Sequence, residues 1–402
     1  MDLLPSAIRL VHTADLHLGS PFSWFPEQAG RLRAEQFDAF LSLIELCERE
    51  RTHLLLIAGD LFDQPESEPA LARRVADALG LLTVTKVFIA SGNHDPAGLN
   101  SPYRTMAWPA CVTVFGGEPA CVELPGLGAA VYGAGFTSAV ATSPIYGPGG
   151  PVPAPGSGLV QILLLHGDLV SGAAPSAYNP ILAGWLAAAG FDYAALGHRH
   201  ASGIGGTVYA YSGCLTGRGF DEPGLRGALA VTLSRVPASG SDGGGRPIRV
   251  KTEIAFLPPP RPARQFIELS VDIASCETPD EAVARVEAAM SSAGLDAWHR
   301  HLYRVSLTGE LPEGETAPAD RVVMRLRDSV FHLALRDRTT ILWDLDALAR
   351  QHSLRGAFVR RVRERMAEAG DRDDGRQVRR LKAAMQTGLQ AARGEVPVDA
   401  AD

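Results

Sequence analysis

Five short apolar segments in the first half of the chain each end beside Asp, Asn or His. They occupy residues 8–12, 53–58, 86–90, 161–165 and 193–196. Nearly continuous hydrophobic runs of this length are typical of strands that are buried on both faces. The intervals between the first three segments carry helical periodicity, over residues 31–51 and 70–82. This alternation of strands and helices predicts an α/β core.

The residues that follow these segments should meet at one edge of the sheet. They are Asp15 and His17, Asp60, the run Asn93, His94 and Asp95, then His166, and finally His198 and His200. In open α/β sheets, ligands bind outside the carboxyl ends of the strands. Glycines stand beside most of these residues and let the backbone turn sharply. We therefore expect the polar side chains to form one site.

The donor types of this site suit metal ions. Carboxylate, carboxamide and imidazole groups without thiolate are typical of Mn, Fe or Zn sites. Seven candidate ligands are too many for one ion and predict two ions that share Asp60; the candidates are Asp15, His17, Asp60, Asn93, His166, His198 and His200. Two ions about 3.5–4 Å apart can hold a phosphoryl oxygen and the attacking water together.

His94 has a different predicted role. We expect it to face the substrate and protonate the leaving oxygen, while Asp95 holds and polarises its imidazole. Each motif alone could be an ordinary turn, but five of them, in order and at strand ends, are not independent turns. Asp63 and Asp168 fit either a role in supporting the ligands or a role in the turns, and His12 lies inside a strand pattern as a core or rim residue.

The order of these motifs, D-x-H, G-D-x-x-D, G-N-H-D, H and G-H-x-H, resembles the calcineurin-like metallophosphoesterase superfamily over about residues 8–215. Residues 12–19 and 59–63 resemble the DNA-repair nuclease branch typified by SbcD. Residues 211–218 and the following Glu222 resemble the YhaO-like bacterial members. Two positions depart from the usual pattern: Cys214 stands where relatives commonly have Asn, and Gly219 where they often have His.

The resemblance implies a fold, a cofactor and a function. The fold would be a metallophosphoesterase β-sandwich flanked by helices, followed by a small α+β capping domain and a helical C-terminal tail. One Mn²⁺ ion would be held by Asp15, His17, Asp60 and His200, and the other by Asp60, Asn93, His166 and His198, with His94 as the catalytic residue. The function would be cleavage of DNA phosphodiesters in DNA repair, as an exonuclease, together with an SMC-like coiled-coil ATPase; a homodimer is also compatible.

The second half of the chain is predicted to form a separate small domain and a C-terminal tail. The Leu-Pro-Pro-Pro-Arg-Pro run at 257–262 separates a nuclease domain, residues 1–258, from a small α+β domain, residues 263–343. The remainder, 344–402, carries two amphipathic helical patterns. Twelve Arg or Lys and five Asp or Glu lie between residues 350 and 393, a local net charge of +7. We interpret this tail as a docking device for a partner helix; packing on the chain's own domains and direct binding of DNA phosphate are the alternatives.

Bulk composition sets the broad class. The formal net charge is −7, the five cysteines are scattered and never form a C-x-x-C, and no signal peptide or membrane-length apolar run is evident. These features predict a soluble cytoplasmic protein without membrane association. Two alternatives to a nuclease remain: a phosphodiesterase of the same superfamily for small molecules or cyclic nucleotides, and a scaffold subunit with a vestigial site.

Overall fold

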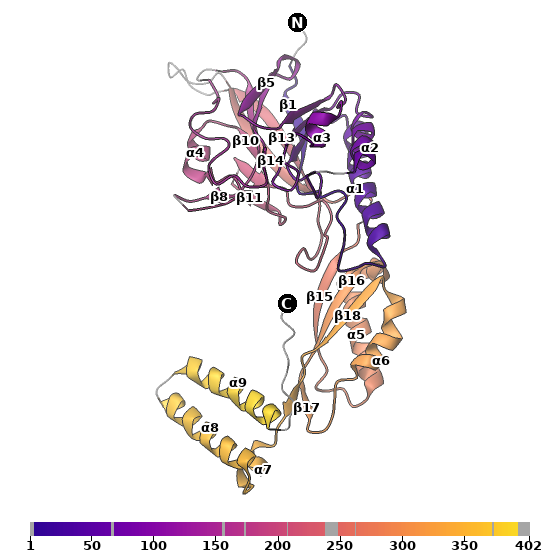
Figure 1. Cartoon of the computed structure of the whole chain (residues 1–402), viewed down its shortest axis with the longest axis vertical. Coiled ribbons are helices and arrows are strands. Elements are labelled where there is room, and N and C mark those ends of the chain that lie inside the picture. Colours follow the sequence, from indigo (N-terminus) through magenta and orange to yellow (C-terminus); the bar gives the residue numbers. More distant parts are fainter. Residues whose placement is uncertain are drawn as a thin grey trace. The chain divides into compact units, whose positions relative to one another are not determined.

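The computed structural model describes residues 4–65, 68–154, 157–172, 174–206, 208–237, 248–261, 263–371 and 374–392. The chain divides into two compact units, Met1–Phe266 and Ile267–Asp402, both traced in Figure 1. Segments 1–258, 263–343 and 344–402 remain the predicted functional divisions. Pro262 of the predicted boundary, and Arg372 and Arg393 of the predicted tail, lie outside the described residues.

Unit 1 is a sandwich of two six-stranded sheets. The first sheet has the order β14 (Ile248–Leu257), β13 (Ala228–Pro237), β1 (Ala7–Thr13), β2 (Leu54–Ala58), β3 (Lys86–Ala90) and β4 (Val112–Phe115). The second has the order β11 (Gly203–Gly205), β12 (Tyr209–Tyr211), β10 (Tyr193–Gly197), β7 (Val160–His166), β6 (Ala129–Gly133) and β5 (Ala120–Leu124). Strands β1 to β4 pair in parallel, as do β6, β7, β10 and β12, so the carboxyl ends within each set lie at a common edge.

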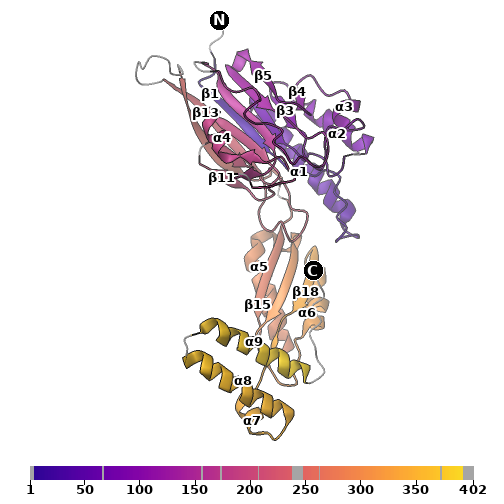
Figure 2. The ribbon, with the colours of Figure 1, turned by 60° about the vertical axis from the view of Figure 1, so that its left-hand side comes forward.

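Helices cover the first sheet on one face, and the second sheet covers the other. Helices α1 (Ala29–Arg49) and α2 (Pro69–Leu79) lie on the same side of this sheet in Figure 2. Along β2, Leu55 and Ile57 pack in the cluster beneath these helices, whereas Leu54 and Leu56 pack against the second sheet. Because successive side chains of a strand point to opposite faces, burial of both faces explains the continuous apolar run.

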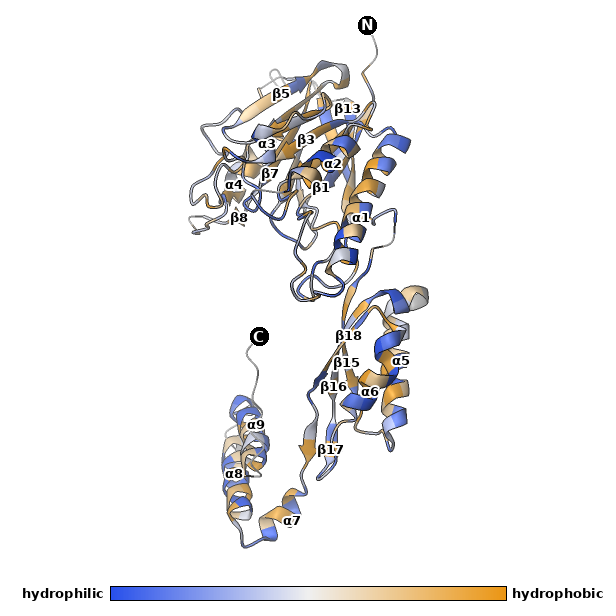
Figure 3. Ribbon diagram, turned by 45° about the vertical axis from the view of Figure 1, so that its right-hand side comes forward, coloured by the Kyte–Doolittle hydropathy of each residue, from blue (hydrophilic) through white to orange (hydrophobic). Residues whose placement is uncertain are grey.

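The short helices and the outer surface complete unit 1. Helices α3 (Pro102–Thr105) and α4 (Ala183–Ala188), and the strand pair β8 (Leu169–Val170) and β9 (Ile181–Leu182), lie in the connections. Leu186 of α4 belongs to the cluster on the outer face of the second sheet, with Leu163 and Leu196. Figure 3 shows the apolar and polar sides of α1. The predicted helix-flanked sandwich is thus confirmed.

Unit 2 contains a small α+β layer. Strands β15 (Phe266–Asp272), β16 (Leu302–Thr308) and β18 (His332–Asp337) form a three-stranded sheet, and β17 (Glu310–Pro312) pairs with β19 (Thr340–Leu342). Helices α5 (Pro279–Gly294) and α6 (Ala319–Leu326) contribute Val286, Met290 and Val322 to one hydrophobic cluster with Tyr303 and Val305. Thr278 caps the start of α5, because its hydroxyl accepts a hydrogen bond from the Glu281 N–H at 3.3 Å.

The C-terminal helices have a hydrophobic cluster of their own. They are α7 (Leu345–Arg350), α8 (Leu354–Asp371) and α9 (Gly375–Ala391). The apolar stripe of α9, formed by Leu381, Met385 and Leu389, is buried in the same cluster as Val359 and Val362 of α8. This stripe therefore packs against α8, and the prediction that the tail docks a partner stays a prediction. Among the helices that are described, none combines the length and apolarity needed to cross a membrane.

Candidate metal centre

Strained backbone marks the strand ends that carry the predicted site. Asp15, His17, Asp60 and His198 all have positive φ, at 52°, 46°, 50° and 101°. This conformation costs a residue other than glycine about 1–3 kcal/mol and persists only where the surroundings fix it. Here the Asp15 N–H donates to the Gly59 carbonyl at 3.1 Å, and the His17 N–H to the Asp60 carbonyl at 2.9 Å. The loops after β1 and β2 therefore hold one another in place.

Two glycines make room for the ligands. A Cβ on Gly59, whose φ is 87°, would lie 2.2 Å from His166 Nδ1. A Cβ on Gly92 would lie 2.1 Å from Asp60 Oδ1. Neither contact is possible for real atoms, so any larger residue at these positions would displace a candidate ligand.

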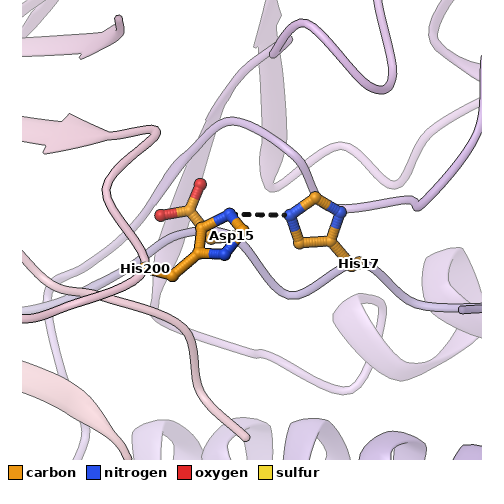
Figure 4. Close-up of side chains that lie close together, drawn as sticks. All are labelled: Asp15, His17 and His200. Carbon is orange, nitrogen blue, oxygen red and sulfur yellow. Dashed lines mark hydrogen bonds between the residues drawn. The ribbon is translucent and has the colours of Figure 1, made fainter. Parts of the chain in front are cut away.

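The first group of candidate ligands is Asp15, His17 and His200. One donor atom from each lies within 4.8 Å of the others. Figure 4 shows the two imidazoles facing each other across this site, with 3.3 Å between their Nε2 atoms. Asp15 and His17 come from the loop after β1, and His200 from the loop after β10. The structure thus joins residues that are 183 positions apart.

The second group lies around Asn93. Its Oδ1 atom is 2.9 Å from His166 Nε2 and 3.1 Å from His198 Nδ1. Asp60 stands between the two groups, because its Oδ2 atom is 3.4 Å from His166 Nε2 and 3.6 Å from His17 Nε2. All seven predicted ligands are therefore brought together, and Asp60 is placed where a shared ligand would be needed.

Hydrogen bonds of His166 and His200, and contacts of His17 and His198 with carboxylates, lie on the far side of the rings and indicate which nitrogen faces inward. His166 Nδ1 donates to the Ala58 carbonyl at 2.8 Å, and His200 Nδ1 to Glu222 Oε1 at 2.6 Å. His17 Nδ1 lies 3.3 Å from Asp63 Oδ1. A proton on Nδ1 leaves the Nε2 lone pair free for a metal ion. For His198 the inward atom is Nδ1, since Nε2 lies 3.5 Å from Asp168. These donors fit a pair of divalent ions.

The electrostatics of the site also favour cations. Burial raises the pKa of Asp15 to about 6, and the neighbouring Asp60 adds to this effect. Burial would likewise raise the pKa of Asp60, but the His166 imidazolium outweighs it and holds this pKa below its usual range. Burial lowers the pKa of both His17 and His198 to about 4, so these rings are neutral and able to coordinate. Two buried carboxylates beside the neutral His17 and His198 rings are chemically suited to a positive ion.

His94 stands apart from the ligands. Its side chain is exposed, its N–H donates to Asp60 Oδ1 at 2.9 Å, and its ring lies 4.7 Å from the His17 ring. The ring nitrogen Nδ1 is 3.2 Å from the Asp63 carbonyl oxygen. An exposed imidazole beside the ligands is suitably placed to exchange a proton with a bound substrate.

The structure corrects the role expected for Asp95. Its carboxylate accepts from the Gly92 N–H at 2.8 Å, the Phe62 N–H at 2.9 Å and the Tyr103 hydroxyl at 2.6 Å. It is buried and is occupied by these donors, whereas the His94 ring bonds to the Asp63 main chain. Asp95 therefore fixes the turn that carries Asn93 and His94, and it does not polarise the imidazole.

Three carboxylates contact the ligand histidines: Asp63, Asp168 and Glu222. The sequence pointed to Glu222 only through the family resemblance. Glu222 is 3% exposed, and besides His200 it accepts from the Arg218 N–H at 2.8 Å and from the Arg218 guanidinium at 2.9 Å. Arg218 also lies 3.2 Å from Asp63 Oδ1. Asp63 and Asp168 each contact a ligand histidine, so the supporting role is the one that the structure favours over a simple turn.

The two positions that depart from the family pattern border this network. Cys214 is buried, and its Sγ lies 3.8 Å from Glu222 Oε2. Gly219 stands against the side chain of Asp221. His12, predicted as a core or rim residue, is buried and lies 2.8 Å from the Tyr193 hydroxyl, so it belongs to the core between the sheets.

A helix-flanked double sheet with a cluster of N and O ligands at the strand ends defines a domain with a candidate centre for divalent metal ions. Comparison with known proteins agrees with this reading: residues 8–202 match the model of the calcineurin-like phosphoesterase family. The family has a dinuclear centre of divalent metal ions, for which the described residues offer candidate ligands.

A curated relative extends the match. The chain is 27% identical over 242 residues to a protein of Bacillus subtilis (strain 168) whose name is "uncharacterized metallophosphoesterase YhaO". The similarity covers 56% of this chain and 58% of that protein, so the chain spans less than two thirds of its relative. The predicted superfamily and the YhaO-like branch are thereby confirmed.

Proposed function

We propose that this chain is a DNA exonuclease that uses two Mn²⁺ ions and acts in DNA repair. The main support for this proposal is that seven N and O ligands from five strand ends lie together, with Asp60 between the two groups of candidate ligands. When bound, two divalent ions would polarise a phosphoryl group. They would also lower the pKa of a bound water, so that a hydroxide nucleophile is available at neutral pH.

The chain's own residues account for the remaining steps. The seven ligands would hold the two ions at which the phosphodiester binds, and the exposed His94 imidazole delivers a proton to the departing oxygen. A sugar alkoxide is a poor leaving group, so this proton matters most when the substrate is a nucleic acid. The likeness of residues 12–19 and 59–63 to DNA-repair nucleases supports DNA as the substrate.

We further propose a coiled-coil ATPase as the partner and the C-terminal helices as the place where it binds. The apolar stripe of α9 is covered, so the contact would rest on the exposed basic side chains, which include Arg365, Arg376 and Lys382. Acidic residues on the partner would complement this surface. Removing the chain beyond Trp343 should abolish co-purification with the ATPase while the nuclease keeps its metal.

A set of substrates tests the main proposal. We would incubate the purified protein with Mn²⁺, with Mg²⁺ or with a chelator, and supply bis(p-nitrophenyl) phosphate, end-labelled linear duplex DNA, circular DNA or a cyclic nucleotide. Mn²⁺-dependent loss of the terminal label and survival of the circle are the expected results. Hydrolysis of the chromogenic diester and the cyclic nucleotide, without any attack on DNA, would instead establish a small-molecule phosphodiesterase.

A further inference from the structure

A cleft lies between α1 and α2, next to the candidate metal centre and outside its ligand set. Its volume is about 680 Å³, within the usual range for ligand-binding cavities. Helix α1 lines it with one face, from Gly30 and Arg33 to Phe37, and α2 lines it with Ala70, Leu71 and Arg74. The cleft is wide because small residues line it: Gly19, Gly30, Ala34 and Ala70.

The cleft begins beside His94. Its wall includes Asp63 and Gln64 from the loop after β2, and Leu18 directly after His17. These loops are tied together, since the Asp63 N–H donates to the Leu18 carbonyl at 3.1 Å. The carbonyl of Asp63 is the group that the His94 ring contacts at 3.2 Å. Asp63 therefore places the cleft next to His94, on the side of the site where the leaving group would receive its proton.

Two arginines give the cleft its charge. The Arg74 guanidinium lies 3.9 Å from the centre of the Phe37 ring, a stacked arrangement that holds the plane of the group and leaves its N–H donors at the edge. Arg33 donates one N–H to the Pro21 carbonyl at 3.3 Å and retains others. Asp63 is already paired with Arg218, and Glu68 stands at the N-terminus of α2, where the helix dipole offsets its charge.

We propose that this cleft binds one nucleotide unit of a polynucleotide on the leaving-group side of the scissile phosphate. Arg33 and Arg74 contact the phosphate of this unit, and the apolar lining at Leu18 and Leu71 faces its sugar and base. Both arginines are exposed, so the strand can continue outward. The proposal rests on the proposed nuclease function and adds the subsite that separates a polynucleotide from a small phosphodiester.

The test compares two substrates in matched variants. Arg74→Ala and Arg33→Ala should each lower kcat/KM for a labelled oligonucleotide about tenfold relative to kcat/KM for bis(p-nitrophenyl) phosphate, mainly through KM. Arg73 and Arg31 are neighbouring exposed arginines outside the cleft, so Arg73→Ala and Arg31→Ala serve as controls for charge alone. Losing one phosphate contact should also reduce the slope of log affinity against log salt by about 1.

A steric variant makes the result independent of charge. Ala34 is exposed on the cleft face of α1, so Ala34→Trp should obstruct the cleft while Ala34→Ser leaves it open. The tryptophan variant should lose oligonucleotide cleavage selectively. If the wild type cleaves the oligonucleotide and the arginine and tryptophan variants match their controls, the cleft proposal is overturned and the nuclease proposal stands. If the wild type hydrolyses only the chromogenic diester, both proposals fall, and equal losses on both substrates would also overturn the cleft proposal.

Discussion

Replacing Glu222 with glutamine should weaken metal binding without disturbing the fold. The Glu222 carboxylate satisfies three converging donors: Oε1 accepts from His200 Nδ1 and the Arg218 guanidinium, and Oε2 accepts from the Arg218 N–H. Glutamine has the same shape but only one oxygen. Its amide must therefore point an N–H₂ group at one of these donors, leaving that donor buried and unpaired.

The substitution should have two effects of predictable size, one on the stability of the fold and one on metal affinity. An unpaired buried donor costs about 1–3 kcal/mol. Changing the hydrogen-bond partner of a metal-bound histidine typically costs about 10–100-fold in metal affinity, or roughly 1.4–2.7 kcal/mol. We therefore expect the dissociation constant of the ion held by His200 to rise by about 10–100-fold in Glu222→Gln, and the metal-free variant to be about 1–3 kcal/mol less stable than the wild type.

Calorimetric titration of the metal-free protein with Mn²⁺ measures this change directly. Asp221→Asn is the matched control, because it removes one negative charge from the adjacent exposed residue. Thermal unfolding of the metal-free variants shows whether the fold is intact: both should unfold cooperatively, with Asp221→Asn melting near the wild type and Glu222→Gln melting a few degrees lower, because its unpaired donor also destabilises the folded state. A Glu222→Gln protein that binds Mn²⁺ as tightly as the control would show that Glu222 does not orient His200.

Three further predictions concern other parts of unit 1. Asp60→Asn should lose most bound metal and activity, since Asp60 contacts both ligand groups; wild-type metal content by elemental analysis would refute the shared role. His94→Ala should keep its metal but lose about 10²–10⁴-fold in turnover on DNA, and less on a p-nitrophenyl ester, whose leaving group needs no proton; equal losses would argue against the general acid. Burial lowers the pKa of His12 to about 3, whereas an unfolded histidine titrates near 6.5, so the metal-free protein should lose stability as the pH falls from about 6.5 toward 3. By pH 4 this loss amounts to roughly 3 kcal/mol, and denaturant unfolding of His12→Gln should show a shallower decline; parallel pH profiles would exclude His12 as the cause.

The ligands could be predicted from the sequence because of a simple geometric rule. The strands that carry them were evident as apolar runs, and parallel strands bring their carboxyl ends to one edge. Asp15 and Asp60 therefore had to lie close together, as did His166 and His198, although nothing in the sequence gives a distance. The strands β4 and β6 were not predicted, because Val112–Phe115 is short and Ala129–Gly133 is made largely of small residues.

Asp95 shows that residues adjacent in the sequence need not interact through their side chains. Asp95 follows His94 directly, which suggested that the two side chains act as a pair. In the structure the backbone turns between them, so that one side chain is buried and the other is exposed. The carboxylate bonds to Phe62, 33 residues earlier, and to Tyr103, eight residues later. Such partners depend on tertiary packing, which no local pattern encodes.

Glu222 and Arg218 could not be assigned for a related reason. They lie in a loop without periodicity, beyond the matched region at 8–202. Their role is evident only from their contacts. Arg218 is paired with Asp63 and with Glu222. Asp63 supports His17, and Glu222 supports His200. The loop after β2 and the loop after β12 are thereby linked behind the two rings that face each other in Figure 4.

This link helps to explain how four ligand positions can remain in left-handed backbone conformations. Their combined cost is on the order of 4–12 kcal/mol, comparable to the whole stability of a typical domain. Backbone bonds between the loops after β1 and β2 offset part of it, and the Arg218 bridge fixes the rings that these loops present. Binding of the ions would stabilise the same arrangement further, because a ligand that binds only the folded state raises its stability. The strain and the ligands are thus coupled, because the strained conformations at Asp15, His17, Asp60 and His198 are those that direct the donor atoms toward the candidate metal centre.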